Sequence, residues 1–179
     1  KPAALYAFLP GGMGINFIKQ FVAAGLSSEV PLVVPGFAAD QDIIRAVGEP
    51  MLGLFSIGHW SVDMTNAANK KFVAEFEKAY GRLPTGYAST GYDTALLIDS
   101  AVRKVKGRIE DKDALRAAIR AADFQSVRGS FRFGHNHFPV QDYYLQLVGK
   151  DASGRIVHKT VGTVLDKRAD AYGQNCKMQ

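Results

Sequence analysis

The amino-acid sequence predicts an α/β fold with a parallel sheet, and two observations lead to this prediction. Up to about Trp60, short apolar runs alternate with segments of helical periodicity, which is typical of right-handed βαβ units. From about residue 129 the pattern changes to alternating apolar and polar residues, which indicates antiparallel strands added at a sheet edge. The length of 179 residues allows one large domain or two small ones.

The first predicted unit is a strand, a glycine turn and a helix. The apolar run from Leu5 to Leu9 predicts a strand buried on both faces. Pro10-Gly11-Gly12-Met13-Gly14 follows as a tight turn. A helix should then end near Gly25, a natural C-terminal cap, because apolar residues recur at helical spacing at Ile15, Phe17, Ile18, Phe21 and Val22.

Two more strands and a helix complete the alternating part. Val30 to Val34 is a valine-rich run that Pro35-Gly36-Phe37 terminates. Asp40-Gln41-Asp42 can cap a short helix, whose apolar residues are Ile43, Ile44 and Val47. The third strand spans Gly53 to Ile57 and ends at His59-Trp60.

Three helices are predicted next. The first runs from about Ala67 to Tyr80, is amphipathic and is capped by Asn66 or Asn69. The second runs from about Tyr87 to Val105 and is apolar on more than one face, so we expect it to be buried. The third spans Asp113 to Ala122.

The last part of the chain is rich in predicted strands. Ser130–Phe133 alternates, His135-Asn136-His137 forms a turn, and Tyr143 to Val148 continues as a strand. Asp151-Ala152-Ser153-Gly154 is a second turn, and Arg155 to Val164 is the final strand.

Composition excludes several classes of protein. The net charge of +5 is spread along the chain, and no basic block is interleaved with aromatic residues, which argues against nucleic-acid binding. No apolar run approaches the ~18–20 residues that cross a bilayer. Cys176 is the only cysteine, so the chain has no internal disulfide. Lys1 lies almost directly before a strand, and we expect a piece of a longer polypeptide.

A ligand is expected at the carboxyl ends of the parallel strands, which meet at one edge of the sheet. The turn from Pro10 to Gly14 can offer backbone N–H groups to an anion. It matches neither a P-loop nor a dinucleotide fingerprint, so a small carboxylate fits better than a nucleotide, and a purely structural turn is the alternative. Phe37 and Trp60 at the other strand ends indicate an apolar pocket or, alternatively, packing at its rim.

We find no residues on which catalysis or metal binding could rest. His135 and His137 need further ligands to hold a metal, and a polar hairpin turn explains them better. Cys176 lies in a polar tail without a recognisable base, and no hydrolase, zinc-protease or kinase signature is present. The sequence therefore predicts a protein that is not an enzyme and has no cofactor.

A set of motifs in fixed order carries a family resemblance. They are Phe8-Leu9-Pro10-Gly11-Gly12-Met13-Gly14, Pro35-Gly36-Phe37, Gly48-Glu49-Pro50-Met51-Leu52-Gly53, Trp60, Asn69-Lys70-Lys71-Phe72-Val73, Tyr80-Gly81-Arg82-Leu83-Pro84, Gly91-Tyr92-Asp93-Thr94-Ala95, Arg128-Gly129-Ser130-Phe131-Arg132-Phe133 and His137-Phe138-Pro139. The whole chain resembles the second half of type I periplasmic solute-binding proteins of ABC importers. Within this family it is most similar to the branched-chain amino-acid group and its relatives for aromatic acids.

The resemblance implies two Rossmann-like lobes with parallel sheets, which are joined by crossing strands and close on a small ligand. This chain would be a C-terminal fragment. Residues 1–61 would form the later part of the second lobe, residues 62–128 would be helices returning to the first lobe, and residues 129–179 would be a β-rich segment crossing the hinge.

The resemblance also implies where the ligand is held. The expected ligand-binding residues are Phe8, Leu9, Pro10, Gly11, Gly36, Phe37, His59 and Trp60. Amino-acid binders of this family hold the ligand's ammonium with an acidic side chain after the second strand. Here Gly36 and Phe37 follow Pro35 without a carboxylate, which favours an aromatic carboxylate, with a branched-chain amino acid next.

The implied function is the substrate-binding component of a bacterial ABC importer, which presents its ligand to a membrane permease. The protein would be periplasmic, or lipid-anchored and extracellular in a Gram-positive organism, with a signal peptide that is not part of this chain. The alternatives are a ligand-sensing regulatory receptor on the same fold and an α/β enzyme that lacks its catalytic half. Because the first lobe is absent, we expect the fragment to self-associate through unpaired edges and apolar surface.

Overall fold

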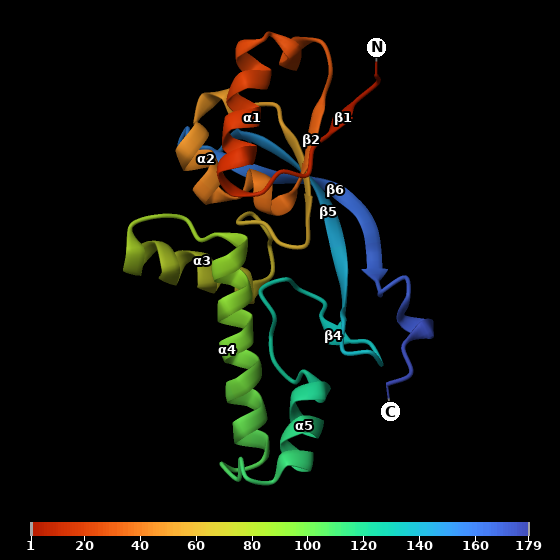
Figure 1. The fold of residues 1–179 in the computed structure, drawn as a ribbon. Helices are drawn as coiled ribbons and strands as arrows, with labels where there is room; N and C mark the ends of the chain where they lie inside the picture. Colours follow the sequence, from red (N-terminus) through yellow and green to blue (C-terminus); the bar gives the residue numbers. More distant parts are fainter. Residues whose placement is uncertain (1, 179) are drawn as a thin grey trace.

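The computed structural model describes residues 2–178. Lys1, the first residue of the segment 1–61 that was assigned to the second lobe, lies outside the described part, as does Gln179. The helices and strands, in chain order, are β1 (Leu5–Tyr6), α1 (Gly11–Ala23), β2 (Leu32–Pro35), α2 (Gln41–Val47), β3 (Phe55–Gly58), α3 (Ala67–Tyr80), α4 (Gly86–Lys104), α5 (Lys112–Ala121), β4 (Arg132–Phe133), β5 (Pro139–Lys150) and β6 (Ile156–Arg168). The molecule is elongated, with α1, α2 and the sheet at one end and α4 and α5 at the other (Figure 1). Within residues 2–178, no helix is long and apolar enough to span a bilayer.

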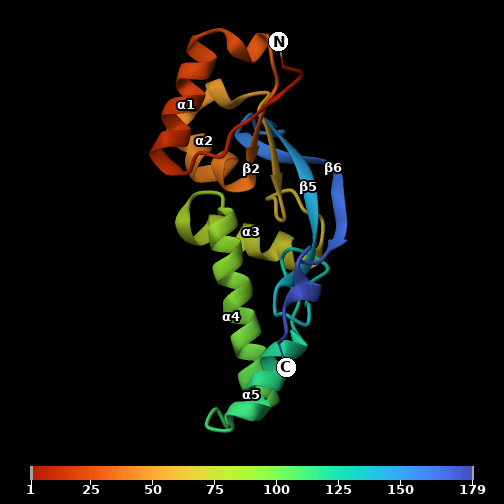
Figure 2. The same cartoon turned by 45° about the vertical axis from the view of Figure 1, so that its right-hand side comes forward.

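The sheet has the topology that the sequence pattern predicts. Its strand order is β1-β2-β3-β5-β4, with β6 paired to β5. β1, β2 and β3 are parallel, whereas β5 joins β3 and β6 joins β5 in antiparallel fashion. The helices α1 and α2 pack beside these strands (Figure 2), around a core that includes Ile18, Phe21, Val34, Met51 and Val148. The α/β class with antiparallel additions is therefore confirmed.

The first strand differs from its prediction. β1 has only two residues and pairs with β2 alone. Tyr6 is 60% exposed and Phe8 is 63% exposed, so the prediction of a strand buried on both faces is wrong. The physical reason is that β1 stands at the edge of the sheet, where only Leu5 and Ala7 reach the core.

Most of the predicted glycine turn belongs to α1. Pro10 is the extended N-cap, and the helix begins at Gly11, so the turn is shorter than predicted. Gly14 is required because a Cβ at this position would lie 2.3 Å from the backbone oxygen of Leu9. Beyond the helix, Gly25 has φ +74° and its N–H donates to the oxygen of Val22 at 2.9 Å, as expected for a C-terminal cap.

The helix α4 is more exposed than its composition predicts. Tyr87 is 71% exposed and Ile98 is 53% exposed, so the prediction of a buried helix is wrong. Its C-terminal half packs against α5 through a small cluster of Ala101, Val105 and Ala118. The described part of the chain covers only one side of α4, and this leaves the second apolar face in solvent.

Two long strands connect the ends of the molecule. β5 and β6 run from the level of α1 and α2 toward that of α5 (Figure 1). β6 extends to Arg168, beyond the predicted end at Val164, whereas β4 keeps only the last two residues of the predicted strand Ser130–Phe133. The later half of β6 exposes apolar side chains, with Val161 52% accessible.

Asn69 links the first turn of α3 to the segment that leaves β3. Its Oδ1 accepts a hydrogen bond from Trp60 Nε1 at 2.7 Å. Its Nδ2 lies 3.1 to 3.3 Å from three backbone oxygens, those of Ser61, Val62 and Met64. Because Asn69 is fully buried, this one amide satisfies groups that water does not reach.

Replacing Asn69 with alanine should destabilise the fold strongly. Asn69→Ala leaves the Trp60 N–H and several carbonyl oxygens unpaired, so we expect a loss of about 2–4 kcal/mol in the free energy of unfolding. Urea unfolding followed by circular dichroism measures this loss. The control is Asn175→Ala, because Asn175 is exposed. Equal midpoints for the two variants would contradict the structural role of Asn69.

We also predict that the 179-residue chain associates with itself. The exposed apolar side chains on β1, α4 and β6 are costly in water, and β6 has an unpaired edge over its later half. Sedimentation velocity over a range of concentrations should show dimers or larger species. A single monomeric species at all concentrations would show that these surfaces are tolerated in water.

Candidate functional site

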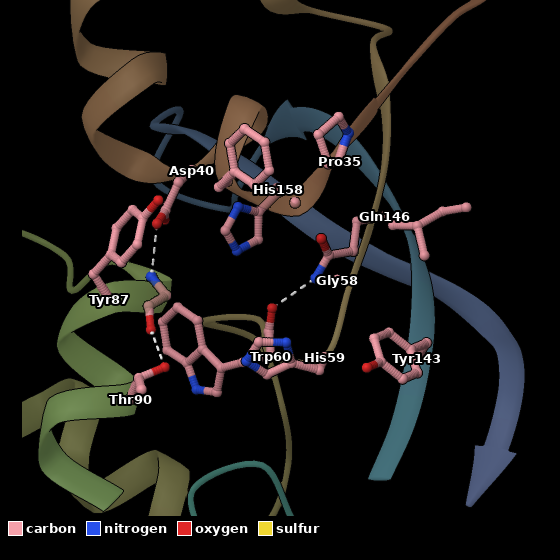
Figure 3. A pocket seen from close by; sticks show the side chains of 14 residues that line it. Pro35, Asp40, Gly58, His59, Trp60, Tyr87, Thr90, Tyr143, Gln146 and His158 are labelled. Atoms are coloured by element: carbon pink, nitrogen blue, oxygen red, sulfur yellow. Dashed lines mark hydrogen bonds between the residues drawn. The ribbon is translucent and has the colours of Figure 1, made fainter. Parts of the chain in front are cut away.

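A cavity of about 290 Å³ lies where β2 and β3 end and α4 begins. It is lined by Pro35, Gly36, Phe37, Asp40, Ile57, Gly58, His59, Trp60, Gly86, Tyr87, Thr90, Tyr143, Gln146 and His158. Figure 3 shows side chains from the sheet, from α4 and from β5 and β6 arranged around this space. Carboxyl ends of parallel strands are the usual ligand sites in open α/β sheets.

Glycines allow the strand ends to approach closely at the cavity. A Cβ at Gly36 would lie 3.1 Å from both Gly58 Cα and the Ile57 oxygen. A Cβ at Gly58 would lie 3.0 Å from Gln146 Oε1. A larger residue at Gly36 would therefore press on the backbone of β3, whereas one at Gly58 would displace the Gln146 side chain.

The predicted ligand-binding residues divide into two groups. Gly36, Phe37, His59 and Trp60 line the cavity, although they come from two different strand ends. Phe8 does not line it, but its ring meets that of Phe37 edge to face, with centroids 5.3 Å apart. The remaining three, Leu9, Pro10 and Gly11, lie outside the lining, between β1 and the start of α1.

For Trp60 the sequence left two alternatives open, an apolar pocket and packing at its rim, and the structure shows features of both. Its ring lines the cavity, yet it is only 4% exposed and packs with Phe72 and Val127 in a second core cluster. The backbone oxygen of Trp60 accepts a hydrogen bond from Gln146 Nε2 at 2.7 Å. This wall is therefore held rigidly by the surrounding structure.

Asp40 brings a carboxylate to the cavity three residues beyond Gly36-Phe37, the pair after the second strand that has none. Its side chain is 4% exposed and lines the cavity. Oδ1 accepts from the N–H of Gln41 at 2.7 Å, which caps α2, and Oδ2 accepts from the N–H of Gly86 at 2.8 Å, at the start of α4. Burial raises the pKa of Asp40, while these hydrogen bonds and His158 oppose the rise. Both oxygens already have partners, so this carboxylate is not free for a ligand's ammonium group.

Two histidines line the cavity, and each has one ring nitrogen without a hydrogen-bond partner among the described residues. His59 Nε2 and His158 Nε2 are both buried and form no hydrogen bond with any of residues 2–178. Burial, helped by the charge of Arg128, lowers the pKa of His59 to about 4. His158 Nδ1 lies 3.2 Å from the backbone oxygen of Ala39. These two rings therefore add buried polar atoms to the cavity lining that no described protein group satisfies.

A buried ion pair lies behind the wall that contains Thr90. Arg128 Nε and Asp93 Oδ2 are 3.3 Å apart, with side chains 10% and 5% exposed. Asp93 also accepts hydrogen bonds from Ser126 Oγ and the Val127 N–H, and Arg128 Nη2 donates to Thr90 Oγ1 at 3.4 Å. Burial lowers the pKa of Arg128, and Asp93 opposes this effect.

Sequence reasoning did not identify most of the residues that come to the cavity from later segments. These are Asp40, Tyr87, Thr90, Tyr143, Gln146 and His158. Asp40 was predicted only as a helix cap. A usable signal existed for Gln146, because it is a polar residue inside an otherwise apolar strand run, whereas His158 is followed by Lys159 and Thr160 and does not stand out in this way. Within residues 2–178, no group of three or more His, Cys, Asp or Glu side chains could hold a metal ion.

Comparison with known sequences identifies the family. A sequence profile described as periplasmic binding protein matches residues 1–153. The Leu/Ile/Val-binding protein homolog 6 of Brucella melitensis is 31% identical over 173 residues, which is 93% of this chain. The chain belongs to the periplasmic binding protein family.

Solved structures agree with this family and with the fold. A solute-binding protein of an ABC transporter from R. palustris, in complex with benzoate, is 36% identical with a TM-score of 0.86 and covers 99% of this chain. Another from Rhodopseudomonas palustris, in complex with 3,4-dihydroxy benzoic acid, is 32% identical with a TM-score of 0.83 over 95% of this chain. A leucine-binding protein from Thermotoga maritima, 21% identical with a TM-score of 0.73 over 91% of this chain, shares the fold.

The periplasmic binding protein chain described here is about half as long as its relatives. It spans 43% of the Brucella protein and 47% of each of the two R. palustris proteins. The resemblance to type I solute-binding proteins is therefore confirmed for a partial chain.

We predict that His59 makes the fold sensitive to acid. In the unfolded chain an imidazole takes up a proton near pH 6.5, but in the fold His59 does so only near pH 4. Between these values the unfolded state binds more protons, so the free energy of unfolding falls as the pH falls from 6.5 to 4. The loss is at most about 3 kcal/mol.

Denaturant unfolding at several pH values between 4 and 7 tests this prediction. His59→Gln should flatten the pH dependence, because glutamine does not titrate. His135→Gln is the matched control, since His135 is exposed and lies in the turn before β5. If His59→Gln kept the pH dependence of the parent chain, another group would be responsible.

Proposed function

We propose that the full-length protein is the solute-binding component of an ABC importer and that its ligand is a small aromatic carboxylate. The observation that carries the proposal is the cavity, whose walls consist largely of the rings of Phe37, Trp60, Tyr87 and Tyr143. Rings of this kind bury a flat apolar ligand with a large hydrophobic gain and favour edge or offset contacts with it. The volume of about 290 Å³ suits a small molecule.

The charge around the cavity supports an anionic ligand. The helix α4 has 19 residues and starts at the cavity with Gly86 and Tyr87, so the positive end of its dipole faces the ligand. The guanidinium of Arg128 lies behind Thr90, although Asp93 compensates much of its charge. Asp40 Oδ2 accepts the Gly86 N–H and offsets part of this dipole, so the positive charge that remains for a ligand's carboxylate on this side is weak.

The same geometry argues against an α-amino acid as the preferred ligand. Among the described residues, Asp40 is the only acidic one that lines the cavity, and each of its oxygens already accepts a backbone N–H. An ammonium group would need a carboxylate from elsewhere in the full-length protein. Two structural relatives are described in complex with benzoate and 3,4-dihydroxy benzoic acid, which supports an aromatic acid. The Brucella relatives' name keeps a branched-chain amino acid as the second choice.

The transport cycle follows from the family and is part of the proposal. The two lobes would close over the ligand, with Phe8, Leu9, Pro10 and Gly11 near the rim on the side of this chain. The closed protein would deliver its ligand to a membrane permease from outside the cytoplasm. This role needs binding and release, and no chemical step.

Isothermal titration of the full-length protein with benzoate and with leucine tests the proposal. We expect benzoate to bind more tightly than leucine. Phe37→Ala should weaken benzoate binding about tenfold or more, because it removes part of the apolar wall. Phe138→Ala is the control, since Phe138 is exposed in the turn before β5 and does not line the cavity. Absence of binding by any aromatic acid would refute the proposed function.

A further inference from the structure

We infer that His158 gives this cavity a preference for aromatic acids that carry a ring hydroxyl, by accepting a hydrogen bond from that hydroxyl at Nε2. The inference rests on the proposed function and deepens it. It concerns one side chain that comes from β6, far along the chain from the strand ends that define the cavity.

The position of His158 is well defined by its surroundings. The side chain is 3% exposed, and its ring lies edge to face against Trp60 with centroids 6.2 Å apart. Figure 3 shows the ring projecting from the sheet side into the cavity, between Asp40 and Trp60. Because the ring is packed on several sides, its remaining nitrogen cannot turn away to solvent.

The hydrogen bond at Nδ1 decides what Nε2 can do. Nδ1 lies 3.2 Å from the backbone oxygen of Ala39, and a carbonyl oxygen only accepts hydrogen bonds. Nδ1 therefore carries the proton in the uncharged imidazole, which leaves Nε2 as an acceptor. Nε2 is buried and has no partner within the described residues.

Three other polar side chains that line the cavity are already engaged. Both oxygens of Asp40 accept backbone N–H groups. The amide of Gln146 donates to the backbone oxygen of Trp60 and accepts from Ser56 Oγ. Thr90 Oγ1 donates to the backbone oxygen of Gly86. His158 Nε2 is consequently an acceptor that no neighbouring protein group satisfies.

A bound aromatic ring makes this nitrogen selective. When water leaves the cavity, an unsubstituted ring leaves the buried acceptor without a partner, which is costly. A ring hydroxyl donates to it and removes that cost. The ligand's carboxylate has only acceptor atoms and gains nothing at Nε2, so we place it toward the start of α4 or the remaining half of the protein.

The first test uses the unmodified full-length protein. Isothermal titration at pH 8 compares benzoate with 3- and 4-hydroxybenzoate and with their methoxy analogues. We expect at least one hydroxybenzoate to bind about tenfold more tightly than benzoate, and its methoxy analogue to lose this advantage because it has no proton to donate.

Two variants then separate the two nitrogens of His158. His158→Asn places an amide near Nδ1, keeps a donor for the Ala39 oxygen and removes the acceptor at Nε2. The affinity for the hydroxylated ligand should therefore fall to about the affinity for benzoate. His158→Gln places an amide near Nε2, and its oxygen can accept the hydroxyl, so the preference should persist. Thermal unfolding without ligand confirms that each variant is folded.

The outcomes distinguish this inference from the proposed function. Binding of benzoate and hydroxybenzoates with equal affinity to the unmodified protein overturns the role of His158 and leaves the aromatic-acid proposal standing. A folded His158→Asn variant with an unchanged hydroxyl preference also overturns it. Absence of binding by every aromatic acid overturns both.

Discussion

The carboxylate of Asp40 is the interaction on which the site depends. It is almost fully buried and accepts one hydrogen bond from the first residue of α2 and one from the first residue of α4. A carboxylate removed from water is expensive unless such donors are present, so both helices must begin where they satisfy it. Burial raises its pKa, and the two N–H donors act in the opposite direction. The start of α4 therefore stays at the mouth of the parallel sheet, and Tyr87 and Thr90 reach the cavity with it.

The chemistry of the cavity follows from which polar groups are satisfied and which are not. Asp40 and Gln146 spend their hydrogen-bonding capacity on the protein itself and act as structural members of the wall. In the part of the chain that the structure describes, His59 and His158 each keep one buried nitrogen without a partner. Aromatic rings supply the remaining surface, so a ligand is held mainly by burial and is distinguished by a few polar contacts.

Local sequence patterns predicted the elements well where a short segment contains all the information. Asn66 caps α3 and the left-handed Gly81 ends it, so this helix lies at its predicted bounds. The predicted burial of β1 and of α4 was wrong for a common reason. Their apolar composition was interpreted as burial, yet burial depends on which elements pack beside them, and in this chain β1 has one neighbouring strand and α4 is covered on one side. The family resemblance rested on motif order along the whole chain and was confirmed.

By itself, the sequence determined the alternation of strands and helices and therefore the parallel sheet, whose strand ends bring Gly36, Phe37, His59 and Trp60 to one cavity. These features follow from periodicity and from residues that are neighbours in the chain. The tertiary structure alone decided that Asp40 joins α2 to α4, and that Tyr143, Gln146 and His158 from β5 and β6 complete the wall. Antiparallel register and helix packing bring these residues together across about a hundred positions of sequence, and no local pattern contains that information.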